Sequence, residues 1–247
     1  MKNTLFISVF TATIITAITA CGGNSGKAKS DEIPTDSMAY SIVKKAKGDS
    51  TLYGLACDGC TDSVVVFLPY EGGDPVTYEI IDALRMGKVF GRPKIGDRLA
   101  LMINPADKEE ATLVINLDDL QGSWCNIFMP KFRDLDNMPP RLQRRIMTDM
   151  PDSVRQKLLV PKEFGFEIKG SNTVSPIGLR QMAQTTDEMS PVEYPKQKRY
   201  REWRIYNGHL LLETKKHGID TADIVLLRPD TLVLRFKDKE QGYYKKN

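Results

Sequence analysis

Short apolar runs separated by turn residues fill the chain beyond residue 50 and restrict it to a mostly β fold. Turn signals recur about every 8 to 12 residues, a spacing typical of β-barrels and sandwiches. The run Val64–Leu68 is continuously apolar, which predicts a strand covered on both faces. The strands expected in this half are Leu52–Cys57, Ser63–Leu68, Val76–Ala83, Met86–Gly91, Arg98–Ile103 and Thr112–Asn116. We therefore expect residues 51–118 to form a small N-terminal β-barrel domain.

The charge of this first half limits the ligands that it can bind. In size and strand spacing, residues 51–118 resemble the oligonucleotide/oligosaccharide-binding (OB) barrels. They carry 6 basic and 11 acidic side chains, whereas residues 119–247 carry 23 basic and 17 acidic ones. A nucleic-acid site needs a basic groove, so we expect no nucleic-acid partner. The opposite charges of the two halves serve either to attract one half to the other or to bind partners.

A Gly-x-Trp motif, Gly122-Ser123-Trp124, opens the second half, residues 119–247. Near the C-terminus the pattern predicts a meander in which Asn207-Gly208 forms a type I′ hairpin turn. Its strands are Tyr200–Tyr206, Leu210–Thr214, Ile224–Leu227, Thr231–Phe236 and Tyr243–Lys245. The motif and the meander together resemble the lipocalins, antiparallel barrels in which the tryptophan of this motif lies across the closed end.

The lipocalin resemblance implies a set of functional residues. Trp124 would close the barrel, and Arg235 would pack over its ring. The barrel would hold a small or amphiphilic ligand. The side chains expected to line its pocket are Trp203, Tyr206, Leu211 and Phe236. In a barrel that is filled by its own side chains, the same residues would be ordinary core.

Residues 126–195 depart from the lipocalin pattern because they contain few clear strands. The segment Met138–Leu158 instead repeats apolar residues every four positions, which predicts a helix that Pro151 must interrupt. We therefore expect a lipocalin-like antiparallel β-barrel with a helical insertion.

The N-terminus resembles a bacterial lipoprotein signal. A basic residue precedes the short apolar run Leu5–Ala20, and small residues lead to Cys21. The resemblance implies that residues 1–20 are removed as a signal peptide. It also implies lipidation of the Cys21 thiol and acylation of the new amino group, as with palmitate. Residues 21–50 are rich in small and charged side chains, which predicts a flexible linker.

If the lipoprotein resemblance holds, the membrane is a partner of this protein through the lipid anchor. Gly22 rather than an aspartate follows the cysteine. This favours a place in the cell envelope at the outer membrane, by similarity to Gram-negative lipoproteins.

The motif Cys57-Asp58-Gly59-Cys60 has three interpretations: a structural turn with a disulfide or with reduced thiols, half of a metal site, or a redox-active dithiol. Asp-Gly at the centre of a hairpin turn favours the structural turn, since a thioredoxin-type dithiol sits at the start of a helix. The ends of such a turn lie within about 7 Å, which a disulfide tolerates. Cys125 is expected to be a small buried hydrophobe on the face of its strand opposite to Trp124.

Common catalytic and cofactor motifs are missing from the sequence, including the P-loop, the dinucleotide-binding glycines and the zinc-protease helix. We therefore expect no cofactor, no metal and no enzymatic activity. The first hypothesis is the binding of a small or amphiphilic ligand in the second barrel. The alternative is a structural or interaction module that recruits another envelope protein. Thiol-disulfide exchange at the C-x-x-C turn ranks third.

Overall fold

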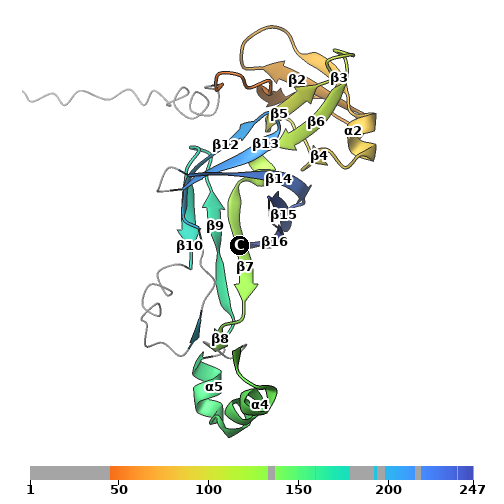
Figure 1. Ribbon diagram of the computed structural model, residues 1–247. Coiled ribbons are helices and arrows are strands. Elements are labelled where there is room, and N and C mark those ends of the chain that lie inside the picture. The colour runs from red at the N-terminus through yellow and green to blue at the C-terminus, as the bar shows by residue number, and fades with distance from the viewer. Residues whose placement is uncertain are drawn as a thin grey trace, which may run out of the picture. The chain divides into compact units, whose positions relative to one another are not determined.

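The computed structural model describes residues 45–132, 137–158, 160–178, 192–193, 198–214, 218–237 and 239–246 (Figure 1). The predicted signal peptide, the lipidation site Cys21 and most of the predicted linker lie outside the described residues. All described residues belong to one compact unit of the chain.

The first half of this unit is a six-stranded sheet in the order β3-β2-β1-β5-β6-β4. Pairing within it is antiparallel except for that of β4 with β6. A parallel bridge between Glu79 and Glu110 brings the end of β3 to the start of β6. The strands are β1 Leu52–Ala56, β2 Val64–Pro69, β3 Val76–Glu79, β4 Val89–Phe90, β5 Arg98–Ile103 and β6 Ala111–Asn116.

Two predicted strands of this half are wrong in extent. The strand expected over Val76–Ala83 ends at Glu79, and the chain continues as the helix α2, Ile81–Arg85. The helix buries Ala83 in the core of the sheet, so tertiary packing outweighs the local β pattern. The strand expected over Met86–Gly91 is reduced to Val89–Phe90, because Gly87, with φ of 66°, lies in the turn that follows α2.

Strand β2 is covered less completely than its apolar run predicts. Val65 and Phe67 are fully buried, whereas Val64, Val66 and Leu68 are half-buried. The two faces of this strand therefore differ, with one in the core of the sheet and the other partly open.

The second half is an eight-stranded antiparallel sheet in the order β10-β9-β7-β16-β15-β14-β13-β12. Its two edge strands meet through a bridge between Thr173 and Glu202 and a hydrogen bond from the Trp203 N–H to the Asn172 carbonyl, at 2.8 Å. The sheet is thus a nearly closed barrel. Its strands are β7 Gly122–Phe128, β9 Lys162–Ile168, β10 Val174–Ile177, β12 Tyr200–Tyr206, β13 His209–Thr214, β14 Ile219–Leu227, β15 Thr231–Phe236 and β16 Glu240–Lys246.

The C-terminal meander confirms the local sequence signals. Strands β12 and β15 have the predicted bounds. Asn207 and Gly208, between β12 and β13, have φ of 48° and 77°, as a type I′ turn requires. The predicted helical insertion is also present, as α4 Pro140–Asp149 and α5 Asp152–Leu158, with the interruption at Pro151. A two-stranded sheet joins β8 Lys131–Phe132 to β11 Val192–Glu193.

The halves are linked by the short helix α3, Leu117–Leu120, whose first turn is capped by Asn116. Its buried Leu117 and Leu120 belong to the same hydrophobic cluster as the barrel core. Ala100 and Ile115 of the first sheet join that cluster as well. The barrel cluster thus extends into the first half, which also has a core of its own that includes Val65, Phe67 and Leu99. Within the described residues, no helix combines the length and the apolar character that crossing a membrane requires.

Candidate functional site

Trp124 lies fully buried at the start of β7, where its indole N–H donates to the Leu120 carbonyl at 2.7 Å. The Lys245 ammonium of the neighbouring strand β16 is 5.1 Å from the centre of the Trp124 ring. Gly122 leaves room for this contact, because a Cβ at that position would lie 2.5 Å from Lys245 Cε. The Gly-x-Trp motif thus places a ring beneath a lysine stem, a cation–π arrangement.

The prediction that Arg235 packs over Trp124 is wrong. Arg235 is about half exposed, and its Nη2 and Nε lie 2.6 and 2.7 Å from the Glu240 carboxylate. The reason is the strand register: Lys245 is the residue of β16 opposite Trp124, whereas Arg235 of β15 is opposite Glu240. The cation over the ring is therefore Lys245.

The interior of the barrel is occupied by its own side chains. Trp124, Leu210, Leu212, Leu232 and Leu234 have no exposed surface. Phe166 makes edge-to-face contact with Tyr243 inside the same cluster, with ring centres 5.0 Å apart. These side chains form a core.

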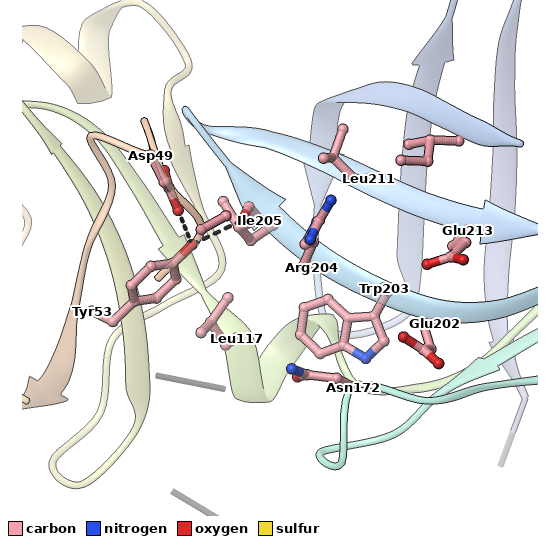
Figure 2. Close-up of a pocket in the computed structure, with 12 residues that line it drawn as sticks. Asp49, Tyr53, Leu117, Asn172, Glu202, Trp203, Arg204, Ile205, Leu211 and Glu213 are labelled. Atoms are coloured by element: carbon pink, nitrogen blue, oxygen red, sulfur yellow. Dashed lines mark hydrogen bonds between the residues drawn. The ribbon is translucent and has the colours of Figure 1, made fainter. Parts of the chain in front are cut away.

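The candidate pocket lies instead where the residues before β1 meet the hairpin of β12 and β13. Figure 2 shows this pocket, of about 160 Å³. Of the four predicted lining residues, the structure places Trp203 and Leu211 here. Tyr206 and Phe236 are not among the lining residues. The pocket is lined by Ala46, Asp49, Tyr53, Leu117, Asn172, Glu202, Trp203, Arg204, Ile205, Leu211, Glu213 and Ile219.

The predicted lining residues have structural roles as well. Trp203 is 3% exposed, and its indole N–H donates to the Lys169 carbonyl at 2.8 Å. Phe236 is partly buried against the barrel core. The polar residues of the pocket were not foreseen, because no local motif marks Asp49 or Tyr53.

The segment before β1 clamps the Asn207-Gly208 turn. Asp49 Oδ1 accepts hydrogen bonds at 2.9 Å from the N–H groups of Thr51 and Asn207. Ser50 donates to Asn207 Oδ1 at 2.8 Å through both its N–H and its hydroxyl. Residues 49 and 50 belong to the predicted flexible linker, so that prediction does not hold for its last residues. Their backbone is held by the hairpin.

The electrostatics of this clamp favour a charged carboxylate beside a neutral phenol. Burial raises the pKa of Asp49, whereas hydrogen bonds from Asn207, Thr51 and Tyr53 lower it. The hydrogen bonds have the larger effect together, so the pKa of Asp49 lies below its ordinary value. Burial and the nearby Asp49 charge raise the pKa of Tyr53. The Tyr53 hydroxyl lies 2.9 Å from Asp49 Oδ2 and 2.8 Å from the Ile205 carbonyl, so its single proton has two acceptors (Figure 2).

Size and lining restrict what the pocket can take. Pockets for drug-sized ligands measure about 300–1,000 Å³ and are mostly apolar. This one is smaller and carries charged groups of both signs, among them Glu202, Arg204 and Asp49. Its chemistry suits a small polar molecule or a few groups of a larger partner, and it does not suit a long acyl chain.

The cysteines fall into two settings. Cys57 and Cys60 are free, partly exposed thiols at the turn between β1 and β2. Cys125 is buried, and burial raises its pKa. In the described part of the chain, no three His, Cys, Asp or Glu side chains gather as metal ligands.

Comparison of the chain with known protein families, with curated proteins and with solved structures found no match.

Proposed function

We propose that this protein is a lipid-anchored recognition module of the cell envelope, without enzymatic activity, that binds another envelope protein through its outer surface. The observation that carries the proposal is the filled barrel, because a packed core leaves a surface as the place for recognition. The hydrophobic cluster to which both halves contribute and the Asp49 clamp support it, since they join the two halves.

The topology supports the two finer fold proposals, an OB-like first half and a lipocalin-like second half. In the first half, three antiparallel strands are followed by α2, by the two-residue strand β4 and then by β5 and β6, and β1 pairs with β5. The parallel bridge from Glu79 to Glu110 turns this sheet toward a small barrel. In the second half, the buried Trp124 under a basic side chain is similar to the closed end of a lipocalin.

A lipid anchor at Cys21 is part of the proposal. The signal-like sequence up to Cys21 supports it, and so does the length of chain between that residue and the clamp at Asp49. We propose that the outer membrane carries the anchor and that residues 22–44 link it to the scaffold.

A second candidate function is the binding of a small polar molecule in the pocket at the clamp. The observation that favours it is the convergence of Arg204, Glu202 and Trp203 on one hollow of about 160 Å³ (Figure 2). Such a ligand would contact both halves and would stabilise the clamp.

Site-specific crosslinking in the native envelope tests the first function. Met86, just after α2, is the most exposed large apolar side chain among the described residues, at 73%. A photoreactive side chain at Met86 is expected to yield one adduct of defined mass, whereas the same group at the exposed Ile127 of β7 is not. Equal adducts at both positions, or none at either, would contradict a specific protein partner on the first half.

A further inference from the structure

The helical insertion obtains little from the two hydrophobic cores. Helix α4 runs from Pro140 to Asp149, and none of its residues is buried. The insertion leaves the sheets after β8 and returns to them at β9, and Figure 1 shows α4 and α5 beyond the end of β7. Short helices in proteins depend mostly on packing of an amphipathic face for their stability. A surface outside the chain would supply such packing for α4.

The two sides of α4 differ in chemistry. With 3.6 residues per turn, its three large apolar side chains fall within about 140° of the circumference, and its three arginines fall within about 100° on the other side. The apolar residues are Leu142, Ile146 and Met147, and the arginines are Arg141, Arg144 and Arg145.

Packing against α5 covers only part of this helix. Ile146 and Met147 are half-buried, and the Arg155 side chain of α5 donates a hydrogen bond to the Met147 carbonyl. Leu142 is 43% exposed, and all three arginines are exposed. The surface that α4 presents to solvent is therefore a basic one with an apolar side chain at its border.

More apolar side chains are exposed where the insertion joins the second sheet. Ile127, in β7, and Met129, just after it, are 60% and 52% exposed. Val160, before β9, is 40% exposed. The two places are adjacent, because Phe128 of β7 pairs with Lys162 of β9. Large apolar side chains that gather on a surface mark a contact with a membrane or a partner.

The charge of the insertion favours an anionic membrane as that contact. Residues 137–158 carry 5 basic and 2 acidic side chains, a net charge of +3, although the first half of the chain beyond residue 50 is acidic. Helices with a basic face and apolar side chains bind at membrane interfaces, where apolar burial adds to attraction by anionic lipids. A lipid anchor would also keep the bilayer at a high effective concentration, so a weak contact would suffice.

Resting on the lipid anchor proposed above, we propose that α4 docks on the surface of an anionic phospholipid bilayer. Leu142 enters the headgroup region, and Arg141 and Arg144 lie at the lipid phosphates. The exposed apolar side chains at the end of β7 and before β9 extend the contact. The insertion thus fixes a face of the protein to the membrane, whereas the linker alone would only limit its distance from it.

Vesicle binding tests the docking. The mature chain, residues 21–247 with Cys21→Ser, has neither the lipid nor the apolar leader, so binding is due to neither. The probes are vesicles of equal parts phosphatidylglycerol and phosphatidylcholine, and vesicles of phosphatidylcholine alone. Sedimentation should show at least about tenfold tighter binding to the anionic vesicles at 0.1 M salt and loss of that binding at 1 M, where the Debye length falls from about 10 to 3 Å. No binding, or equal binding to both vesicles, would overturn the proposal without the use of any variant.

Two matched pairs of variants locate the contact. Arg141→Gln with Arg144→Gln should weaken binding to the anionic vesicles about 25-fold, since each basic side chain near such a surface contributes about fivefold. Arg85→Gln with Arg92→Gln, the same change of charge on exposed side chains of the first half, should weaken it less than about twofold. Leu142→Glu should weaken binding at least about fivefold, and Ile95→Glu, at a side chain that is 71% exposed in the first half, should not. Equal losses within either pair would show a general effect of net charge and would overturn docking at α4.

Crosslinking in the native envelope separates a membrane from a protein at this site. A photoreactive side chain at Leu142 should yield lipid adducts, and a single protein adduct there would overturn the proposal. If the anchor is found on Cys21 or Met86 crosslinks to one partner while the vesicles fail to bind, the docking is refuted and the proposed function stands. If the vesicles bind through α4 but Cys21 carries no lipid and Met86 gives no adduct, the reverse holds.

Discussion

Replacing Asp49 by alanine removes the centre of the clamp between the two halves. Asp49 is 7% exposed. Its carboxylate accepts hydrogen bonds from the backbone N–H groups of Thr51 and Asn207 and from the Tyr53 hydroxyl. A hydrogen bond to a charged group contributes about 1.5–3 kcal/mol, and a buried N–H left without an acceptor costs about 1–3 kcal/mol. Tyr53 can still donate to the Ile205 carbonyl. We expect a loss of about 3 kcal/mol.

For a chain of this length, 1 kcal/mol changes the melting temperature by about 2–4 °C, so Asp49→Ala should melt about 10 °C below the parent. The assay is thermal and urea unfolding of the Cys21→Ser protein, followed by circular dichroism. The matched control, Asp74→Ala in the exposed turn before β3, should stay within about 0.5 kcal/mol of the parent. A loss below 1 kcal/mol for Asp49→Ala would refute the reasoning that the clamp joins the halves.

The Asp49 clamp and the buried Trp124 ring can also be tested separately. The pKa of Asp49 is lower in the folded protein than its ordinary value of 3.8. Its contribution to stability is therefore complete above that value and is lost as the pH falls through the folded pKa. The difference in unfolding free energy between the parent and Asp49→Ala should shrink below about pH 4, and a constant difference would contradict this. Trp124→Ala should cost about 3–5 kcal/mol in a urea titration, because the ring is fully buried, and a cost below 1 kcal/mol would remove the lipocalin argument. Lys245→Met should lower the free energy of unfolding by about 0.5–2 kcal/mol, because the cation–π contact is lost. Arg235→Ala should change it by no more than about 0.5 kcal/mol. Equal effects in the same titration would show that the cation over the ring has been misassigned.

Local signals in the sequence predicted the elements whose causes are local. Asn207-Gly208 requires two residues with positive φ, which few other pairs adopt, and the turn is present. Pro151 separates α4 from α5 because it cannot continue a helix. Strand β9 was not predicted, although Phe164, Phe166 and Ile168 alternate with Gly165 and Glu167 with the period of two that is typical of a strand.

The contacts that the sequence did not predict depend on the long-range arrangement of the chain. Lys245 meets Trp124 through the register of β16 and β7, which no spacing in the sequence reveals. Asp49 and Ser50 were assigned to the linker because their neighbours are charged. Their hydrogen-bond partner Asn207, however, lies in a hairpin more than 150 residues along the chain. The sequence named Trp203 and Leu211 as pocket residues, but it placed them inside a barrel that their neighbours fill.

Native mass spectrometry of the Cys21→Ser protein, secreted into its own envelope compartment and compared with the denatured chain, tests the filled barrel most directly. The account predicts that no amphiphilic ligand is carried, so that the native and denatured masses agree, with at most a loss of two protons if Cys57 and Cys60 have paired. A stoichiometric adduct of lipid-like mass that is present natively and lost on denaturation would contradict the account and restore the barrel interior as a binding site.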